Sequence, residues 1–196
     1  MRTLLCAALT VLACPTSGWA EEPIDGGATD PDDRPPVVNR VNLRVGTAST
    51  DQNGRPTICL DVRVIGKLGV ETCGTGQAVL HNEPGAEMAH FRATYSLANR
   101  ALWKGTVHAR GGVGFAEMQL GIDHPGFQFG QPDADRGSVA GPEASFSAQW
   151  LLPLYKDLDF VVTGTAGLAY FAGADELVTP RRELQGFASI EAGIGW

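Results

Sequence analysis

The stretch Ala144–Leu154, with the sequence ASFSAQWLLPL, decides the fold class. Every second residue from Ala144 onward is apolar, and Ser145, Ser147 and Gln149 stand between the first of them. Successive side chains of a β-strand point to opposite faces, so this alternation predicts a strand with one apolar and one polar face. A helical period of 3.6 residues does not fit the pattern.

The same period of two recurs along most of the chain. The predicted strands cover residues 39–50, 57–65, 67–74, 86–98, 103–120, 142–154, 157–171 and 184–196. Short connections near 66, 99–103 and 155–157 alternate with longer ones at 51–56, 75–85, 121–141 and 172–183. Eight strands joined in this way predict an all-β fold, an eight-stranded antiparallel up-and-down β-barrel.

The N-terminus carries the features of an export signal. Residues 1–20 contain Arg2, an apolar segment and a small-x-small site at Gly18-Trp19-Ala20, which together predict a secretory signal peptide. The acidic, proline-rich residues 21–38 are predicted to be a disordered periplasmic leader, and residues 39–196 to be the barrel. The sequence around Cys14 is similar to a bacterial lipobox, so lipidation of Cys14 stays open as an alternative.

Two cysteines remain after the signal peptide is removed. Cys59 and Cys73 flank a predicted hairpin whose loop is Ile65-Gly66-Lys67, with Gly66 at positive φ. The apolar alternation then pairs Val64 with Leu68 and places Cys59 opposite Cys73. A pair of cysteines in an exported chain indicates a disulfide, with two buried free thiols as the alternative.

Composition excludes several classes of function. Apolar residues make up 43% of the 196 residues and charged residues 19%, which is typical of a folded chain. The formal net charge of −7 leaves no basic stripe for nucleic acid, so no nucleic-acid partner is expected. The usual zinc, redox, hydrolase and phosphate-loop motifs are missing from the sequence, so we expect neither a cofactor nor a metal nor an enzymatic activity.

Alternation alone does not say which face lies inside the barrel. A soluble barrel has an apolar interior, whereas a membrane barrel has an apolar exterior. The polar face here is rich in small and hydroxyl residues and carries four arginines and four carboxylates, which suits a plug of ion pairs. The predicted luminal polar residues are Arg44, Asp61, Arg63, Glu71, His90, Arg92, His108, Arg110, Asp159 and Glu191.

Aromatic residues add a second argument for a membrane. Tyr95, Trp103, Trp150 and Trp196 fall toward the strand ends on the short-turn side. Such clustering is expected of an aromatic belt at a membrane interface. Together with the polar face, it predicts a transmembrane β-barrel.

The last strand carries a family resemblance. Residues 187–196, FASIEAGIGW, alternate in apolar character and end on an aromatic residue, like the terminal signal of outer-membrane proteins. With the export signal and eight strands, the chain resembles small bacterial outer-membrane β-barrels of the OmpA/OmpW type. The resemblance implies the bacterial outer membrane as location, insertion by the barrel assembly machinery, and contact with outer-membrane lipid and lipopolysaccharide.

We expect a largely plugged lumen and a structural or surface-interaction role, with the outer loops contacting a surface or envelope protein partner. The candidate loop contacts are His124, Phe127, Phe129, Asp133 and Asp135. Three further functions stay open at this point. They are a small pore or carrier for hydrophobic solutes, a lipid-modifying envelope enzyme, and a soluble exported lipocalin-like binding barrel.

Overall fold

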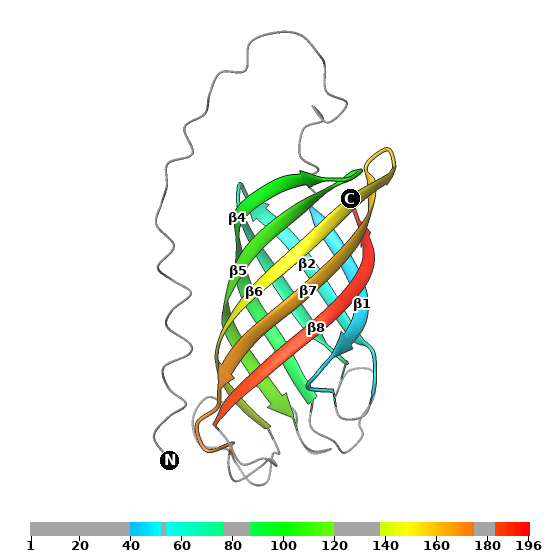
Figure 1. The fold of residues 1–196 in the computed structure, drawn as a ribbon. Coiled ribbons are helices and arrows are strands. Elements are labelled where there is room, and N and C mark those ends of the chain that lie inside the picture. Colours follow the sequence, from blue (N-terminus) through cyan, green and yellow to red (C-terminus); the bar gives the residue numbers. More distant parts are fainter. Residues whose placement is uncertain (1–39, 52–53, 77–86, 120–137, 175–182) are drawn as a thin grey trace, which may run out of the picture. The chain divides into compact units, whose positions relative to one another are not determined.

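The computed structural model describes residues 40–51, 54–76, 87–119, 138–174 and 183–196. Eight antiparallel strands form one closed, ring-like sheet, in which each strand pairs with the next and the last pairs with the first (Figure 1). The strands are β1 (Val41–Ala48), β2 (Thr57–Ile65), β3 (Leu68–Gly74), β4 (Glu87–Leu102), β5 (Gly105–Gln119), β6 (Ser138–Tyr155), β7 (Leu158–Tyr170) and β8 (Leu184–Gly195). The predicted all-β fold with eight antiparallel strands is confirmed. Within the described ranges, no helix has the length and apolar character needed to cross a membrane.

The two ends of the ring differ in their connections. At one end, two-residue turns join β2 to β3, β4 to β5 and β6 to β7, with positive φ at Gly66, Trp103 and Lys156. We call this the short-turn end; Arg40 also lies there, since its amide bonds the carbonyl of Trp196. At the opposite end, which we call the long-connection end, β1, β3, β5 and β7 end and β2, β4, β6 and β8 begin (Figure 1).

Apolar side chains point out of the ring and polar ones point in. Phe146 and Leu168 are each 54% exposed, whereas the intervening polar positions of the same strands are largely buried. Further exposed apolar residues include Leu43, Val45, Leu60, Val70, Leu97, Val113, Ile190 and Ile194. The alternation in the sequence therefore follows the two faces of the ring, with the apolar face outside.

A small apolar cluster lies buried toward the long-connection end. It consists of Met88, Ala116, Met118, Val139, Ala169, Phe171, Ala174 and Phe187. Met88 and Met118 are directly opposite each other on β4 and β5, and Met118 is opposite Val139 on β6. The buried residues thus include an apolar cluster toward one end and a set of charged residues along the middle of the ring.

Two predicted connections are wrong in detail. Residues 99–103 were expected to form a connection, but β4 continues to Leu102 and only Trp103 and Lys104 make the turn. Likewise β6 begins at Ser138, inside the expected connection 121–141. In both cases pairing with β5 overrides the weak strand propensity of the local sequence.

The hairpin of β2 and β3 keeps the predicted register for only part of its length. Cys59 is opposite Cys73 as predicted, but Val64 does not pair with Leu68. A register shift after Arg63 pairs Ile65 with Leu68 and shortens the loop to two residues. A bulge that absorbs one residue permits a tight two-residue turn, which suits the right-handed twist of paired strands.

Two glycines on β5 differ in the space that is available for a Cβ atom, and this difference gives a matched test of the fold. A Cβ atom on Gly114 would lie 2.1 Å from the carbonyl oxygen of Phe91, whereas one on Gly111 would meet only the Leu97 Cδ1 atom at 3.8 Å. We predict that Gly114→Ala lowers the free energy of unfolding by about 1–3 kcal/mol, because the backbone at Phe91 must move to accommodate the added Cβ atom. Gly111→Ala is expected to leave it nearly unchanged. Urea unfolding of the refolded protein measures the free energy of unfolding of both variants. An equal loss of stability in the two variants would contradict the packing around Gly114.

Candidate functional site

Most of the predicted luminal residues lie buried inside the ring, and we call them the interior network. Arg44, Asp61, Glu71, His90, Arg92, His108, Arg110, Asp159 and Glu191 are all buried. Arg63 is half-buried and lies nearer the short-turn end, beside Lys67. These side chains come from seven of the eight strands, so the network includes residues from most of the ring.

On the short-turn side of the middle, the network centres on Arg110 and Asp61. Arg110 donates from Nη1 to Asp61 Oδ2 at 2.6 Å and from Nη2 to Asp61 Oδ1 at 2.9 Å. It also donates to the Thr94 hydroxyl at 2.6 Å, and Asn42 donates to Asp61 Oδ2 at 3.1 Å. The two-pronged pairing holds both side chains in one geometry and satisfies most of the carboxylate's acceptors.

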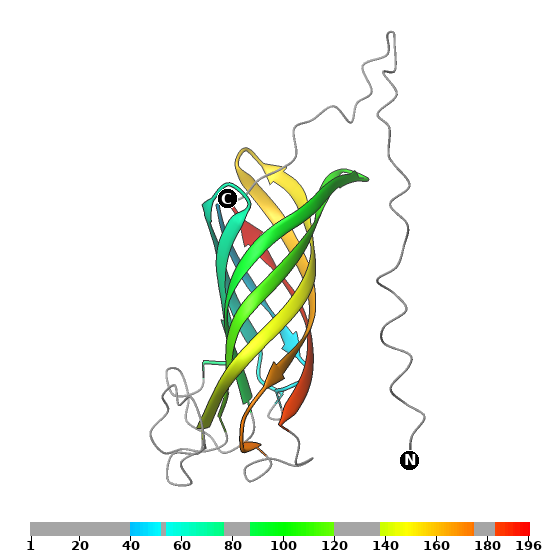
Figure 2. The same cartoon turned by 90° about the vertical axis from the view of Figure 1, so that its left-hand side faces the viewer.

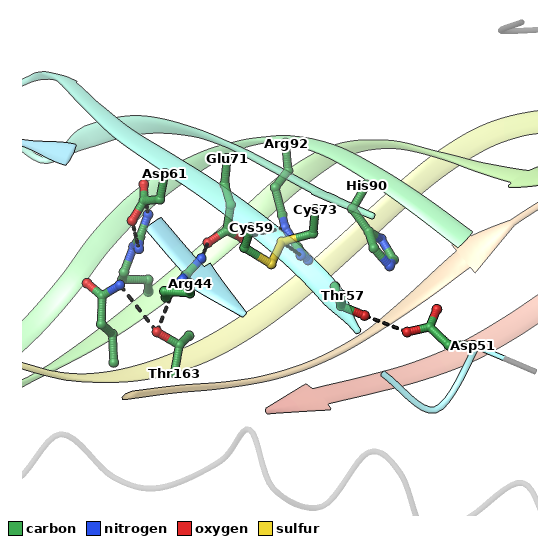
Figure 3. Close-up of a disulfide and its surroundings, with 12 residues drawn as sticks. Arg44, Asp51, Thr57, Cys59, Asp61, Glu71, Cys73, His90, Arg92 and Thr163 are labelled. Atoms are coloured by element: carbon green, nitrogen blue, oxygen red, sulfur yellow. Dashed lines mark hydrogen bonds and ion pairs between the residues drawn. A yellow bond between two sulfur atoms is a disulfide. The ribbon is translucent and has the colours of Figure 1, made fainter. Parts of the chain in front are cut away.

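The middle of the ring is crossed by a chain of alternating charges (Figure 3). Arg44 donates to the Thr163 hydroxyl at 2.6 Å and to Glu71. Glu71 in turn forms an ion pair with Arg92, with 2.7 Å between Glu71 Oε1 and Arg92 Nε. Glu191, only 2% exposed, interacts electrostatically with both arginines. The Glu71 carboxylate is therefore compensated by guanidinium groups from β1 and β4.

Beyond Arg92 the network reaches a histidine and a glutamate. The Nδ1 atom of His90 lies 2.6 Å from Glu143 Oε2. The ring of Phe187 packs against His90, with its centroid 4.4 Å from that of His90 and 5.7 Å from the guanidinium carbon of Arg92. The pair thus lies between the charged middle of the ring and the apolar cluster.

Glu143 was missed by the sequence reasoning, although a signal for it was present. It occurs in phase with Ser145 and Ser147, the inward polar positions of the same strand. Glu87 and Glu117 are also buried and were also missed. Among the residues that the structure describes, the buried carboxylates therefore exceed the buried arginines, and the predicted balance of four against four does not hold.

The predicted disulfide is confirmed. Cys59 on β2 and Cys73 on β3 are directly opposite each other, joined by a disulfide and buried inside the ring. The Nη2 atom of Arg92 lies 3.7 Å from the Cys73 sulfur, so the disulfide packs against the charged middle (Figure 3). It locks the register of the hairpin that carries Asp61 and Glu71.

Two further polar contacts lie at the long-connection end, where β1 and β3 end. Asp51 Oδ2 accepts a hydrogen bond of 2.5 Å from the Thr57 hydroxyl, and the Thr75 hydroxyl donates to Glu87. Burial raises the pKa of Asp51, and the hydrogen bond from Thr57 partly opposes this shift. These bonds attach the residues that follow β1 and β3 to the strands that come next.

The four predicted interfacial aromatics all lie toward the short-turn end. Trp103 is in the turn between β4 and β5, and its ring meets Trp150 edge-on with 6.1 Å between centroids. Trp196 follows β8, where its amide bonds the carbonyl of Val41, and Tyr95 is opposite Leu68 at the start of β3. Tyr155, which was not predicted, joins them beside the last short turn.

The predicted loop contacts His124, Phe127, Phe129, Asp133 and Asp135 lie outside the described residues, as do Cys14 and the predicted signal peptide and leader. In the part of the chain that the structure describes, no group of three His, Cys, Asp or Glu side chains is placed to hold a metal ion. Comparison with family models, curated proteins and solved structures finds no match to this chain.

The pair of Arg110 and Asp61 permits a direct test of the network. We predict that Arg110→Met lowers the free energy of unfolding by about 3–5 kcal/mol, because it leaves the Asp61 carboxylate buried without its cation. The double variant Arg110→Met with Asp61→Leu should regain more than half of that loss, since no uncompensated charge remains. Denaturant unfolding measures both. A double variant as unstable as the single one would show that this ion pair does not hold the interior together.

Proposed function

We propose that this chain is a transmembrane β-barrel of the bacterial outer membrane, of the OmpA/OmpW type, with lipid around its apolar outer face. The observation that carries the proposal is the inversion of polarity across the sheet: charged side chains are buried inside and large apolar ones are exposed outside. Soluble monomers rarely expose apolar patches larger than a few hundred Å². The exposed apolar residues here occur on all eight strands, which agrees with a continuous lipid-facing band.

The aromatic residues support the same orientation. Trp103, Trp150, Tyr155 and Trp196 gather at the short-turn end, next to Lys104 and Lys156. Tryptophan and tyrosine favour the membrane–water interface because they combine an apolar ring with a polar group. In outer-membrane barrels the short turns face the periplasm, so this belt would lie at the periplasmic interface.

The filled interior favours a structural or surface-interaction role over transport. The ring is crossed by the pairs Arg44–Glu71 and Arg110–Asp61, and the cavity beside the second pair measures only about 10 Å³. That volume holds about one water molecule. A small pore or a carrier for hydrophobic solutes would require these buried ion pairs to separate. We therefore propose a role in surface interaction, in which the loops of the long-connection end contact a surface or envelope partner.

A soluble binding barrel and a lipid-modifying enzyme receive less support from the geometry. A lipocalin-like binding barrel needs an apolar interior, whereas the middle of this ring is charged. An enzyme acting on lipid needs reactive groups that a lipid can reach, whereas the His90–Glu143 pair is buried beneath Phe187.

Arginine substitutions at two outward positions of β6 test the membrane location. Phe146 lies midway along β6, and Tyr155 ends the strand at the short-turn end. We predict that Phe146→Arg lowers the free energy of folding into bilayers by about 2–4 kcal/mol, because a charge at the bilayer midplane is costly. Tyr155→Arg, near the interface, should cost about 0–1 kcal/mol.

Both side chains are more than half exposed, so a water-soluble protein would tolerate both arginines. Unfolding in lipid vesicles gives the two free energies. Similar, small effects at both positions would contradict a lipid-facing band.

A further inference from the structure

Strand β4 extends well past its neighbour β3 at the short-turn end. Pairing between the two strands ends with Leu68 opposite Tyr95, followed by one bond from the Ser96 amide to the Lys67 carbonyl. Beyond that point, residues 98–102 of β4 pair with β5 alone among the described residues, and Leu97 lies at a register shift. Figure 2 shows the tip of this hairpin leaning away from the rest of the ring. The segment 97–102, which we call the free edge, is exposed throughout.

The direction of the backbone groups on the free edge follows from the turn. A two-residue turn closes on the pair Leu102–Gly105, so Leu102 and Arg100 direct their backbone groups toward β5. Because backbone direction alternates along a strand, Asn99 and Ala101 direct their N–H and C=O groups to the open side. An exposed edge of this kind is a template for another extended chain.

A cleft lies beside the free edge. It has a volume of about 460 Å³ and occupies the notch between the short β2–β3 hairpin and the longer β4–β5 hairpin. Its lining residues are Arg63, Gly66, Lys67, Ser96, Leu97, Ala98, Asn99 and His108. The side chains of an added strand would therefore enter a polar notch with cationic groups on its wall.

The charged residues of the two hairpin tips beside the notch are all basic. Neither 62–70 nor 93–116, which form the two hairpin tips, contains an acidic residue, although the whole chain has a net charge of −7. Basic side chains come from Arg63 and Lys67 on one hairpin and from Arg100 and Lys104 on the other. A second copy of the chain would bring like charges together at this edge, whereas an acidic segment would be attracted.

We propose that the free edge is a docking site for an extended acidic segment of a partner protein, which pairs with β4 as an additional strand. Backbone hydrogen bonds to Asn99 and Ala101 supply the pairing, and Lys67 and Arg100 select acidic side chains. This site depends only on the exposed edge and its charge, so it is independent of the proposed role of the long connections.

A proline substitution tests the backbone pairing. The probe is a fluorescent eight-residue peptide of alternating valine and glutamate, added to the full chain in detergent. Ala101→Pro removes a free-edge N–H and spares the bonds to β5, since proline is tolerated on an exposed strand edge. We expect the peptide to bind about tenfold more weakly to Ala101→Pro, as for the loss of one or two hydrogen bonds, while the control Ala101→Thr binds like the unaltered protein.

Charge variants complete the test. Lys67→Glu and Arg100→Glu should each weaken binding of the glutamate peptide, and a valine–lysine peptide should not bind. The proposal is overturned if neither peptide binds, if the lysine peptide binds equally well, or if Ala101→Pro binds as tightly as Ala101→Thr. It is also overturned if the protein alone forms a dimer that Ala101→Pro abolishes, because a second copy is then the occupant. Unaltered unfolding midpoints show that each variant is folded.

Discussion

The buried ion pairs are the interaction on which the rest of this structure depends. A closed ring of eight strands leaves an interior just wide enough for side chains to fill. Here much of the filling is charged, and guanidinium groups pair with carboxylates from other strands. Arg44, Glu71 and Arg92 meet across the middle, and Arg110 meets Asp61 nearer the short turns. Charged residues occupy much of the inside, and every strand carries large apolar residues on the outside.

The two ends of the ring differ in the residues that they carry. The apolar cluster around Met88 and Phe187 lies toward the long-connection end, while the short-turn end carries the aromatic residues and the free edge of β4. Because side chains fill much of the interior, we propose that partners meet the protein at its ends. The proposed surface contacts and the proposed strand docking use opposite ends and do not compete.

Much of the fold could be predicted because its signal is local. The alternation around Phe146 shows one strand and its two faces, and the hairpin phase places Cys59 opposite Cys73. The length of β4 could not be predicted, because only pairing with β5 makes residues 99–102 extended. The side-chain partners could not be predicted either. Glu143 and His90 are 53 residues apart in sequence, and alternation shows which face a side chain occupies but not which side chain it contacts.

The central claim is that the polarity of the sheet is inverted because lipid surrounds it. Its most direct test is the electrophoretic mobility of the full-length protein from fractionated cells, with and without boiling. We predict that the protein is found in the washed outer-membrane fraction and that boiling shifts its mobility, because a folded membrane barrel resists detergent until it is heated. Recovery in the soluble periplasmic fraction, with the same mobility before and after boiling, would contradict the claim.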